Sequence, residues 1–144
     1  MNHISWWDTH IGNEEIELVT KSIANRNIGM GSVTKTFENN ISKLLNVEYV
    51  VATPSGSTAL YMSLMILGVG AGDEVIIPDR TFIATAHAVK LTGAKVITVD
   101  CNELDTNIDI SKIEEKITPN TKVIIPVHLN GRCVDMKAIN NIAS

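Results

Sequence analysis

The chain has 144 residues, of which 44 % are hydrophobic, and a formal net charge of −4 at pH 7. A chain of this length fits one ordinary domain with its own core, and the lack of any basic run argues against a nucleic-acid partner. The first ten residues lack a charged-then-apolar signal pattern and no apolar run approaches a membrane span, so we expect a cytoplasmic protein with no membrane partner.

The first third of the sequence predicts two amphipathic helices separated by a glycine-containing break. The residues of one face recur at helical spacing, first at Ile16, Val19, Thr20 and Ile23, and then at Phe37, Ile41, Leu44 and Leu45. Residues 27–32, with Gly29 and Gly31, separate the two helices. Trp6 and Trp7 precede the first helix, and we interpret them as packing or interface residues.

From Tyr49 onward, short apolar runs alternate with helix-like segments. The runs are rich in valine and isoleucine, which is typical of strands buried on both faces: 49–53, 74–77, 95–99 and 122–125. Helices are predicted between them over 58–67, 82–91 and 111–117, and the first of these is apolar nearly all round and should be buried. This alternation predicts an α/β fold with a mostly parallel sheet and helices on both faces.

The sequence Ser55-Gly56-Ser57-Thr58 stands between the first predicted strand and the helix that follows it. A helix that begins there directs unpaired backbone N–H groups at one point, where Gly56 lets an anion approach and Ser57 and Thr58 can add hydroxyl donors. In open parallel sheets ligands bind beyond the carboxyl ends of the strands, which also fits this position. The alternative is an ordinary strand-to-helix junction, with a serine as N-cap and Gly56 in the turn.

Several further blocks occur in an order and spacing that resemble one known family. They are Gly72-Asp73-Glu74-Val75-Ile76-Ile77-Pro78, Thr81-Phe82-Ile83-Ala84-Thr85-Ala86, Gly93-Ala94-Lys95, Val99-Asp100 and Pro126-Val127-His128-Leu129. The chain resembles the DegT/DnrJ/EryC1/StrS sugar aminotransferases from about Glu14 to its last residue. The resemblance implies the large domain of a fold type I pyridoxal-phosphate enzyme.

The resemblance also assigns roles to individual residues. It implies that Gly56, Ser57 and Thr58 bind the phosphate of pyridoxal 5′-phosphate and that Phe82 stacks on the cofactor ring; the alternative for Phe82 is a core residue at a helix start. The family's usual cradle reads Ser-Gly-Thr-Ala-Ala, so Ser57 and Thr58 are a departure from it. Gly31 and His128 are weak candidates for contacts with the sugar substrate, with a helix-end turn and a structural histidine as the alternatives.

The family's two remaining catalytic groups have no counterpart here. In the family, the aspartate against the pyridine nitrogen and the lysine that forms the Schiff base lie beyond the segment that this chain matches, so we assign no catalytic residue. We expect the chain to be the N-terminal portion of a longer enzyme and to be inactive alone. Its predicted parts are a helical segment over 1–33 and an incomplete cofactor-binding α/β domain over 34–144.

The resemblance implies an aminotransferase for a nucleotide-linked keto-sugar, with glutamate as amino donor, in polysaccharide or amino-sugar biosynthesis. It also implies a homodimer. Two alternatives remain: a sugar dehydratase of the same family, in which histidine replaces the lysine, and a non-catalytic binding domain on the same scaffold. No metal site is predicted, because Asp100, Asp105 and Asp109 fit a loop and a helix cap, and because Cys101 and Cys133 are isolated thiols that we expect to be reduced and buried.

Overall fold

The computed structural model describes residues 9–144, and the chain divides after Ala52 into two compact units. The two tryptophans interpreted as packing or interface residues, Trp6 and Trp7, lie outside the described residues. Within residues 9–144, no helix is both long enough and apolar enough to cross a membrane. The division after residue 33 that the sequence suggested stays a prediction for the whole protein.

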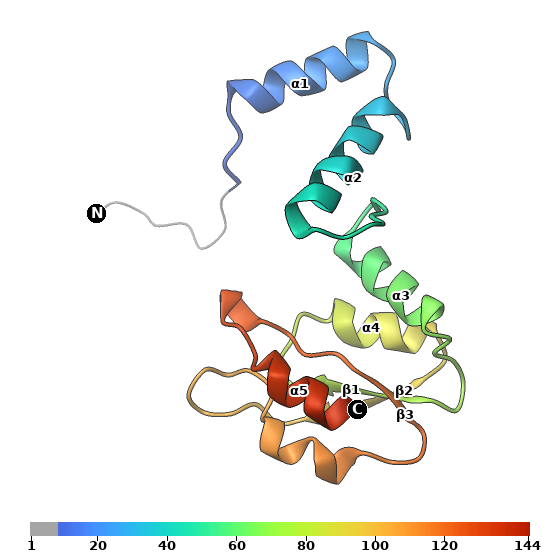
Figure 1. Cartoon of the computed structure of the whole chain (residues 1–144), viewed down its shortest axis with the longest axis vertical. Helices are drawn as coiled ribbons and strands as arrows, with labels where there is room; N and C mark the ends of the chain where they lie inside the picture. The colour runs from blue at the N-terminus through green and yellow to red at the C-terminus, as the bar shows by residue number, and fades with distance from the viewer. Residues whose placement is uncertain (1–8) are drawn as a thin grey trace. The chain divides into compact units, whose positions relative to one another are not determined.

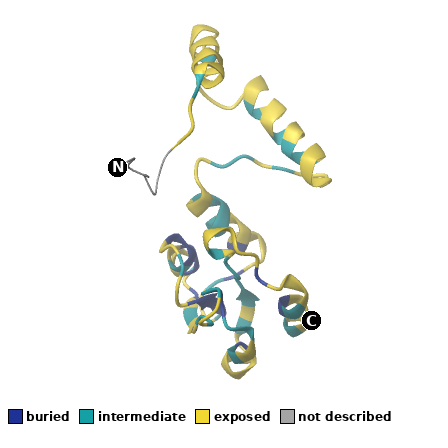
Figure 2. Ribbon diagram, turned by 90° about the vertical axis from the view of Figure 1, so that its left-hand side faces the viewer, coloured by how far each residue is buried: buried dark blue, intermediate teal, exposed yellow. Residues whose placement is uncertain are grey.

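The N-terminal unit contains the two expected helices, α1 (Asn13–Ala24) and α2 (Ser32–Leu45). At the start of α1, the Glu15 carboxylate accepts a hydrogen bond from the Gly12 amide at 2.6 Å. At the end of α2, Asn46 adopts the left-handed conformation that terminates many helices. Neither helix contains a buried residue, as the absence of dark blue on these helices in Figure 2 shows. The apolar faces of both helices are therefore exposed within this unit.

The second unit is built on three parallel strands: β1 (Glu74–Pro78), β2 (Lys95–Val99) and β3 (Thr121–Ile124). Their order is β2-β1-β3, so the connection from β2 to β3 crosses the central strand. Helix α4 (Ala84–Leu91) joins β1 to β2, as expected of a βαβ unit. The α/β fold class with a mostly parallel sheet is confirmed.

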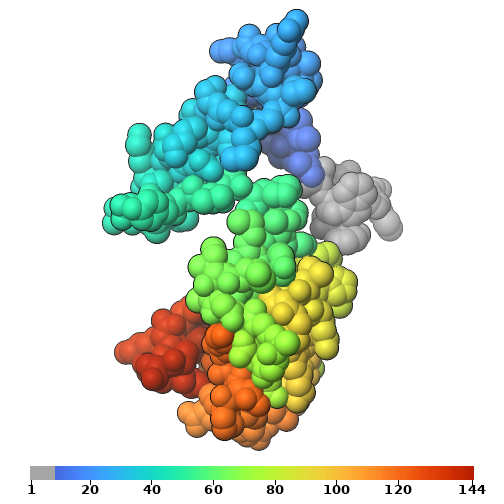
Figure 3. Space-filling model, turned by 90° about the vertical axis from the view of Figure 1, so that its right-hand side faces the viewer, coloured from blue at the N-terminus to red at the C-terminus, as the bar shows by residue number. Residues whose placement is uncertain are grey.

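Alternation along β1 divides the core between the two faces of the sheet. Val75 and Ile77 pack with Leu64 of α3 (Gly56–Ile66) and with Val89 of α4, whereas Ile76 points to the other face. That second face is covered by α5 (Met136–Ala143) and by the connection that contains the 3-10 turns η1 (Ile110–Lys112) and η2 (Glu114–Lys116). Figure 1 shows α4 and these turns on opposite sides of the strands, and in Figure 3 the green atoms of α3 lie against the yellow atoms of α4. Helices thus cover both faces.

Three local predictions were wrong. Residues 49–53 form no strand, because none of the described strands pairs with their backbone groups and apolar composition alone cannot hold a strand. Residues 111–117 form two 3-10 turns instead of one α-helix, with the fully buried Ile113 fixed in the core between them. In α3 only Leu64 is buried, because a single face of this helix packs on α4 and the sheet.

Candidate active site

The start of α3 is shaped by its own serine and threonine side chains. Ser55 is the N-cap: its Oγ accepts a hydrogen bond from the Thr58 amide at 3.2 Å and lies 3.0 Å from the Thr58 hydroxyl. Its carbonyl accepts from the Ala59 amide at 3.0 Å. The amides of Gly56 and Ser57 make no hydrogen bond within residues 9–144. The N-cap interpretation of a serine therefore holds for Ser55, and it leaves two adjacent donors free.

These two residues open onto a cavity of about 650 Å³ in the C-terminal unit. Three segments line it, namely the first two turns of α3, the segment after β1 that leads into α4, and the segment after β3. The lining residues are Gly56, Ser57, Ala59, Leu60, Ser63, Thr81, Phe82, Ala84, Thr85, Val127, His128, Leu129 and Asn130. Two of the three segments follow the carboxyl ends of strands, where ligands of open parallel sheets bind.

Phe82 faces the cavity with an exposed ring. The segment around it is anchored by Ala84 and Thr85, which are buried, and by a contact of 2.8 Å between the hydroxyls of Thr81 and Thr85. Phe82 itself is 76 % exposed and lies two residues before the start of α4. A phenylalanine that stabilises a core is buried, so within the described chain Phe82 does not act as a core residue. Its flat face is available to a ligand.

His128 combines a structural contact with a place in the cavity wall. Its Nδ1 accepts a hydrogen bond from the Val134 amide at 3.1 Å, which makes Nδ1 the unprotonated nitrogen and places the proton of the neutral ring on Nε2. The following Asn130 has φ 53° and Gly131 has φ 77°, so the chain reverses tightly beside the cavity. Asn130 also lines the cavity.

The structure brings together four of the six residues singled out from the sequence: Gly56, Ser57, Phe82 and His128. Thr58 does not line the cavity, because its amide and hydroxyl both face Ser55. Gly31 belongs to the N-terminal unit, where it is the N-cap residue of α2. The roles of all six stay predictions.

Sequence reasoning did not single out four polar residues of the lining, namely Ser63, Thr81, Thr85 and Asn130. Ser63 lies four residues after Ala59 and Thr85 lies three residues after Phe82. Side chains three or four positions apart share one face of a helix, so this spacing was the available signal.

Charged side chains are absent from the part of the cavity wall that residues 9–144 supply. No lysine, aspartate or glutamate of the described residues lines it, and the position of the catalytic lysine and aspartate stays a prediction. Among the described residues, no group of three or more histidine, cysteine, aspartate or glutamate side chains could hold a metal ion. This cavity can bind and orient a ligand, but its walls within residues 9–144 offer no free general base, because the lone pair of His128 Nδ1 accepts from the Val134 amide.

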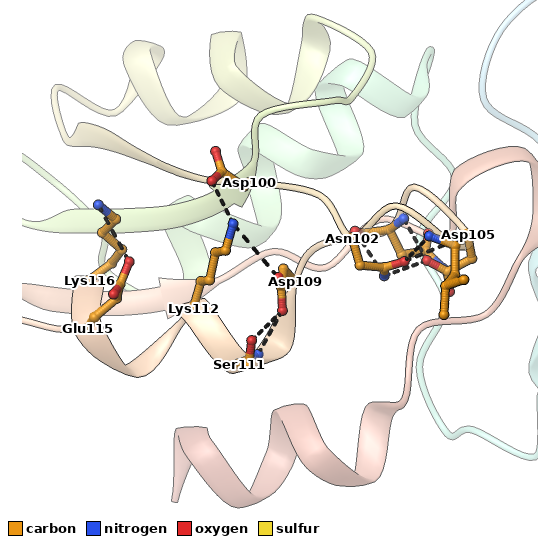
Figure 4. Close-up of polar contacts among 10 residues, drawn as sticks. Asp100, Asn102, Asp105, Asp109, Ser111, Lys112, Glu115 and Lys116 are labelled. Carbon is orange, nitrogen blue, oxygen red and sulfur yellow. Dashed lines mark hydrogen bonds and ion pairs between the residues drawn. The ribbon is translucent and has the colours of Figure 1, made fainter.

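The three aspartates and two cysteines after β2 behave as structural groups. Asp109 accepts from the Ser111 amide at 3.1 Å as the N-cap of η1, and Asp100 pairs with Lys112 at 2.8 Å (Figure 4), so the loop and cap interpretation is confirmed for them. Cys133 is exposed, which corrects the expectation of two buried thiols, and both thiols are free. Burial and a hydrogen bond to the Asp79 side chain raise the pKa of the Cys101 thiol, so this thiol stays protonated at neutral pH.

The fold and cavity together define an α/β protein in which a helix start with two free amides lies beside an exposed aromatic ring, at the carboxyl edge of a parallel sheet. The chain belongs to the DegT/DnrJ/EryC1/StrS aminotransferase family, whose model matches residues 9–144. The family and fold type expected from the sequence are confirmed.

Two relatives are named as sugar aminotransferases. The chain is 42 % identical over 141 residues to the 3-oxo-glucose-6-phosphate:glutamate aminotransferase of Bacillus subtilis, an alignment that covers 95 % of this chain and 32 % of that protein. It is 44 % identical over 115 residues to the UDP-2-acetamido-2-deoxy-3-oxo-D-glucuronate aminotransferase of Pseudomonas aeruginosa, covering 80 % of this chain and 32 % of that protein.

A solved relative shows the same fold with a cofactor. NtdA from Bacillus subtilis, with bound cofactor PMP, matches with a TM-score of 0.86 and 42 % identity, over 92 % of this chain and 32 % of that one. Solved members of the family thus carry the expected cofactor, pyridoxal 5′-phosphate, or its amino form. The chain spans about a third of the length of these relatives.

Proposed function

We propose that the complete protein is a pyridoxal-phosphate-dependent aminotransferase that acts on a keto-sugar, and that the cavity described above holds its cofactor. One observation carries the proposal: the free amides of Gly56 and Ser57 and the exposed ring of Phe82 border the same cavity. A phosphorylated, flat, aromatic ligand needs an anion site and a planar apolar partner, and these residues supply both.

The residues fit the cofactor sterically and electrostatically. The cavity volume of about 650 Å³ lies within the range of about 300–1,000 Å³ typical of small-molecule sites. A β-carbon placed on Gly56 would have no heavy atom within 4 Å, so the space in front of this residue is open. The helix dipole and the two free amides favour an anion here, and the Ser57 hydroxyl adds a donor. Thr58 contributes through its contact with Ser55, which fixes the helix start.

The other residues of the cavity orient the ligand and exclude water. Ala59, Leu60, Val127 and Leu129 supply apolar walls, which lower the local dielectric and strengthen the hydrogen bonds to the phosphate. When bound, pyridoxal phosphate acts as an electron sink and carries the amino group between donor and acceptor. The lysine and aspartate that this chemistry needs come from parts of the complete protein beyond this chain.

The proposed substrate class follows from the relatives. Two of them are named for 3-oxo sugars, one linked to UDP and the other a 6-phosphate. The name of the enzyme for the 6-phosphate also includes glutamate. We infer a nucleotide-linked keto-sugar as acceptor and glutamate as donor, in polysaccharide or amino-sugar biosynthesis in the cytoplasm. Gly31 and His128 remain candidates for sugar contacts.

We also propose that the complete protein is a homodimer. The exposed apolar side chains of α1 and α2, including Ile16, Val19, Phe37 and Leu44, would be costly to leave in water. Light scattering at micromolar concentration should give the mass of two chains, and a monomer would contradict the proposal.

Amino transfer by the complete protein, loaded with pyridoxal phosphate and glutamate, tests the proposed activity. A UDP-linked 3-oxo sugar and a 3-oxo sugar phosphate are offered separately, and we expect an amino sugar from the first. The 144-residue chain, incubated with cofactor and reduced with borohydride, is the comparison. Mass spectrometry should find only scattered, substoichiometric lysine labelling in it, because no lysine of residues 9–144 lines the cavity. One stoichiometric adduct, with amino transfer, would overturn the assignment of catalysis to the rest of the protein.

A further inference from the structure

Asn107 is a buried polar residue that the proposed chemistry does not use. It lies between β2 and η1 and is 2 % exposed. Its Nδ2 donates to the Asp105 carboxylate at 3.2 Å and to the Arg132 carbonyl at 3.1 Å, and its Oδ1 accepts from the Leu129 amide at 3.1 Å. Both donor hydrogens and the acceptor are therefore used, which few side chains other than a primary amide could do.

Two of these three bonds cross to the segment 128–132, more than twenty residues later in the chain. They reach Leu129 and Arg132, one near each end of that segment. A third hydrogen bond joins segment 128–132 to the turn that contains Asn107, since the Arg132 guanidinium donates to the Asp105 carbonyl at 3.2 Å. Asn107 thus acts as a clamp across the tight reversal formed by Asn130 and Gly131.

The clamped segment contains a single 3-10 turn, η3 (Leu129–Gly131), which Asn130 distorts with its left-handed backbone. Its backbone hydrogen bonds are short-range, such as that from the Leu129 amide to the Val127 carbonyl at 3.0 Å. The same Leu129 amide also donates to Asn107 Oδ1. The segment nevertheless supplies three residues of the cavity wall: His128, Leu129 and Asn130. Irregular segments with few internal bonds open easily unless outside contacts hold them.

The side chain of Asn107 is itself held in orientation by its neighbours. Asp105 accepts from the Asn107 amide at 2.9 Å and from the Asn102 side chain (Figure 4 shows Asn102 and Asp105). The bond from the Asn107 amide, followed by that from Asn102, lowers the pKa of Asp105, so this carboxylate remains an acceptor at neutral pH. The turn from Asn102 to Asn107 is consequently a rigid base for the clamp.

We propose that Asn107 is a positioning residue of the active site, which fixes the wall formed by His128, Leu129 and Asn130 through its bonds to Leu129 and Arg132. The role in the active site rests on the proposed function, whereas the clamp itself does not. Asn107 does not itself line the cavity, so it acts only through the segment that it holds.

The test compares two variants of the complete protein. Asn107→Leu removes all three bonds while it keeps a buried side chain of similar size. Asn102→Ala is the matched control, because Asn102 braces the same turn but makes no hydrogen bond to segment 128–132. Hydrogen exchange of the peptide that contains Leu129 reports on the clamp, and titration with pyridoxal phosphate, followed by the visible absorption of the bound cofactor, reports on the site.

In Asn107→Leu we expect exchange at Leu129 to accelerate by about tenfold relative to the peptide of β1, and the dissociation constant of the cofactor to rise by about tenfold. Asn102→Ala loosens the turn but removes no bond to segment 128–132, so it should change both quantities clearly less than Asn107→Leu does. If Asn107→Leu does not fold, Asn107→Ser replaces it. A serine hydroxyl places no charge beside Asp105 and is too short to reach both Leu129 and Arg132, so we again expect faster exchange at Leu129 and weaker cofactor binding.

Equal effects of the two substitutions would overturn the proposal, because Asn107 would then only stabilise the turn. Faster exchange with unchanged cofactor affinity would overturn its role in the active site and leave the proposed function standing. If the unmodified protein binds no cofactor, the proposed function fails, and the exchange data alone then confirm or refute the clamp.

Discussion

The substitution Gly56→Val tests the anion site at the point where the geometry is most specific. A β-carbon at position 56 meets no heavy atom within 4 Å, and the backbone there is not in the left-handed region, so the variant should fold with its stability changed by no more than about 1 kcal/mol. The branched side chain would, however, occupy the open space in front of the free amides of Gly56 and Ser57.

The expected loss of binding follows from those two amides. A hydrogen bond to a charged group contributes about 1.5–3 kcal/mol, so losing both would cost about 3–6 kcal/mol, or a rise of roughly 10²–10⁴-fold in the dissociation constant of pyridoxal phosphate. Cofactor titration and thermal denaturation of the complete protein measure the two effects separately. Gly70→Val is the control, since Gly70 also faces open space and does not line the cavity. Unchanged cofactor affinity in folded Gly56→Val would refute the phosphate site.

Two more predictions concern the cofactor ring and the response to acid. Phe82→Ala should lose cofactor affinity but change the stability by less than about 1 kcal/mol, because the ring is 76 % exposed. Phe82→Tyr keeps a flat ring and should bind the cofactor normally. Loss of the circular-dichroism signal in Phe82→Ala would instead mark Phe82 as a core residue. Hydrogen bonds from the Thr118 hydroxyl at 2.6 Å and the Lys95 ammonium at 3.0 Å hold the pKa of Glu74 below its usual 4.5. A carboxyl with a lowered pKa in the folded state stabilises the fold above its unfolded pKa, and this stabilisation disappears as the pH falls through the folded value. Glu74→Gln should therefore lower the melting temperature at pH 7 and much less below the folded pKa, and a difference that grows towards acid would contradict this reasoning.

The sequence alone predicted the elements that have local signals. Apolar periodicity located α1, α2, β1 and β2 to within a few residues, because burial imposes one repeat on helices and another on strands. The junction from Ser55 to Thr58 predicted a helix start, since a serine before a glycine can cap free amides without outside help. Several family-like blocks in the family's order predicted the fold type and the cofactor, which no single block could have predicted.

Tertiary structure decided everything that depends on a partner distant in the chain. Residues 49–53 have strand composition and no strand, because a strand exists only where a neighbour pairs with it. Phe82 has the composition of a core residue and an exposed ring, because Ala84 and Thr85 occupy the interior in its place. The role of Asn107 could not be predicted from the sequence, because its hydrogen bonds join it to Leu129 and Arg132. No local sequence pattern encodes contacts across more than twenty residues.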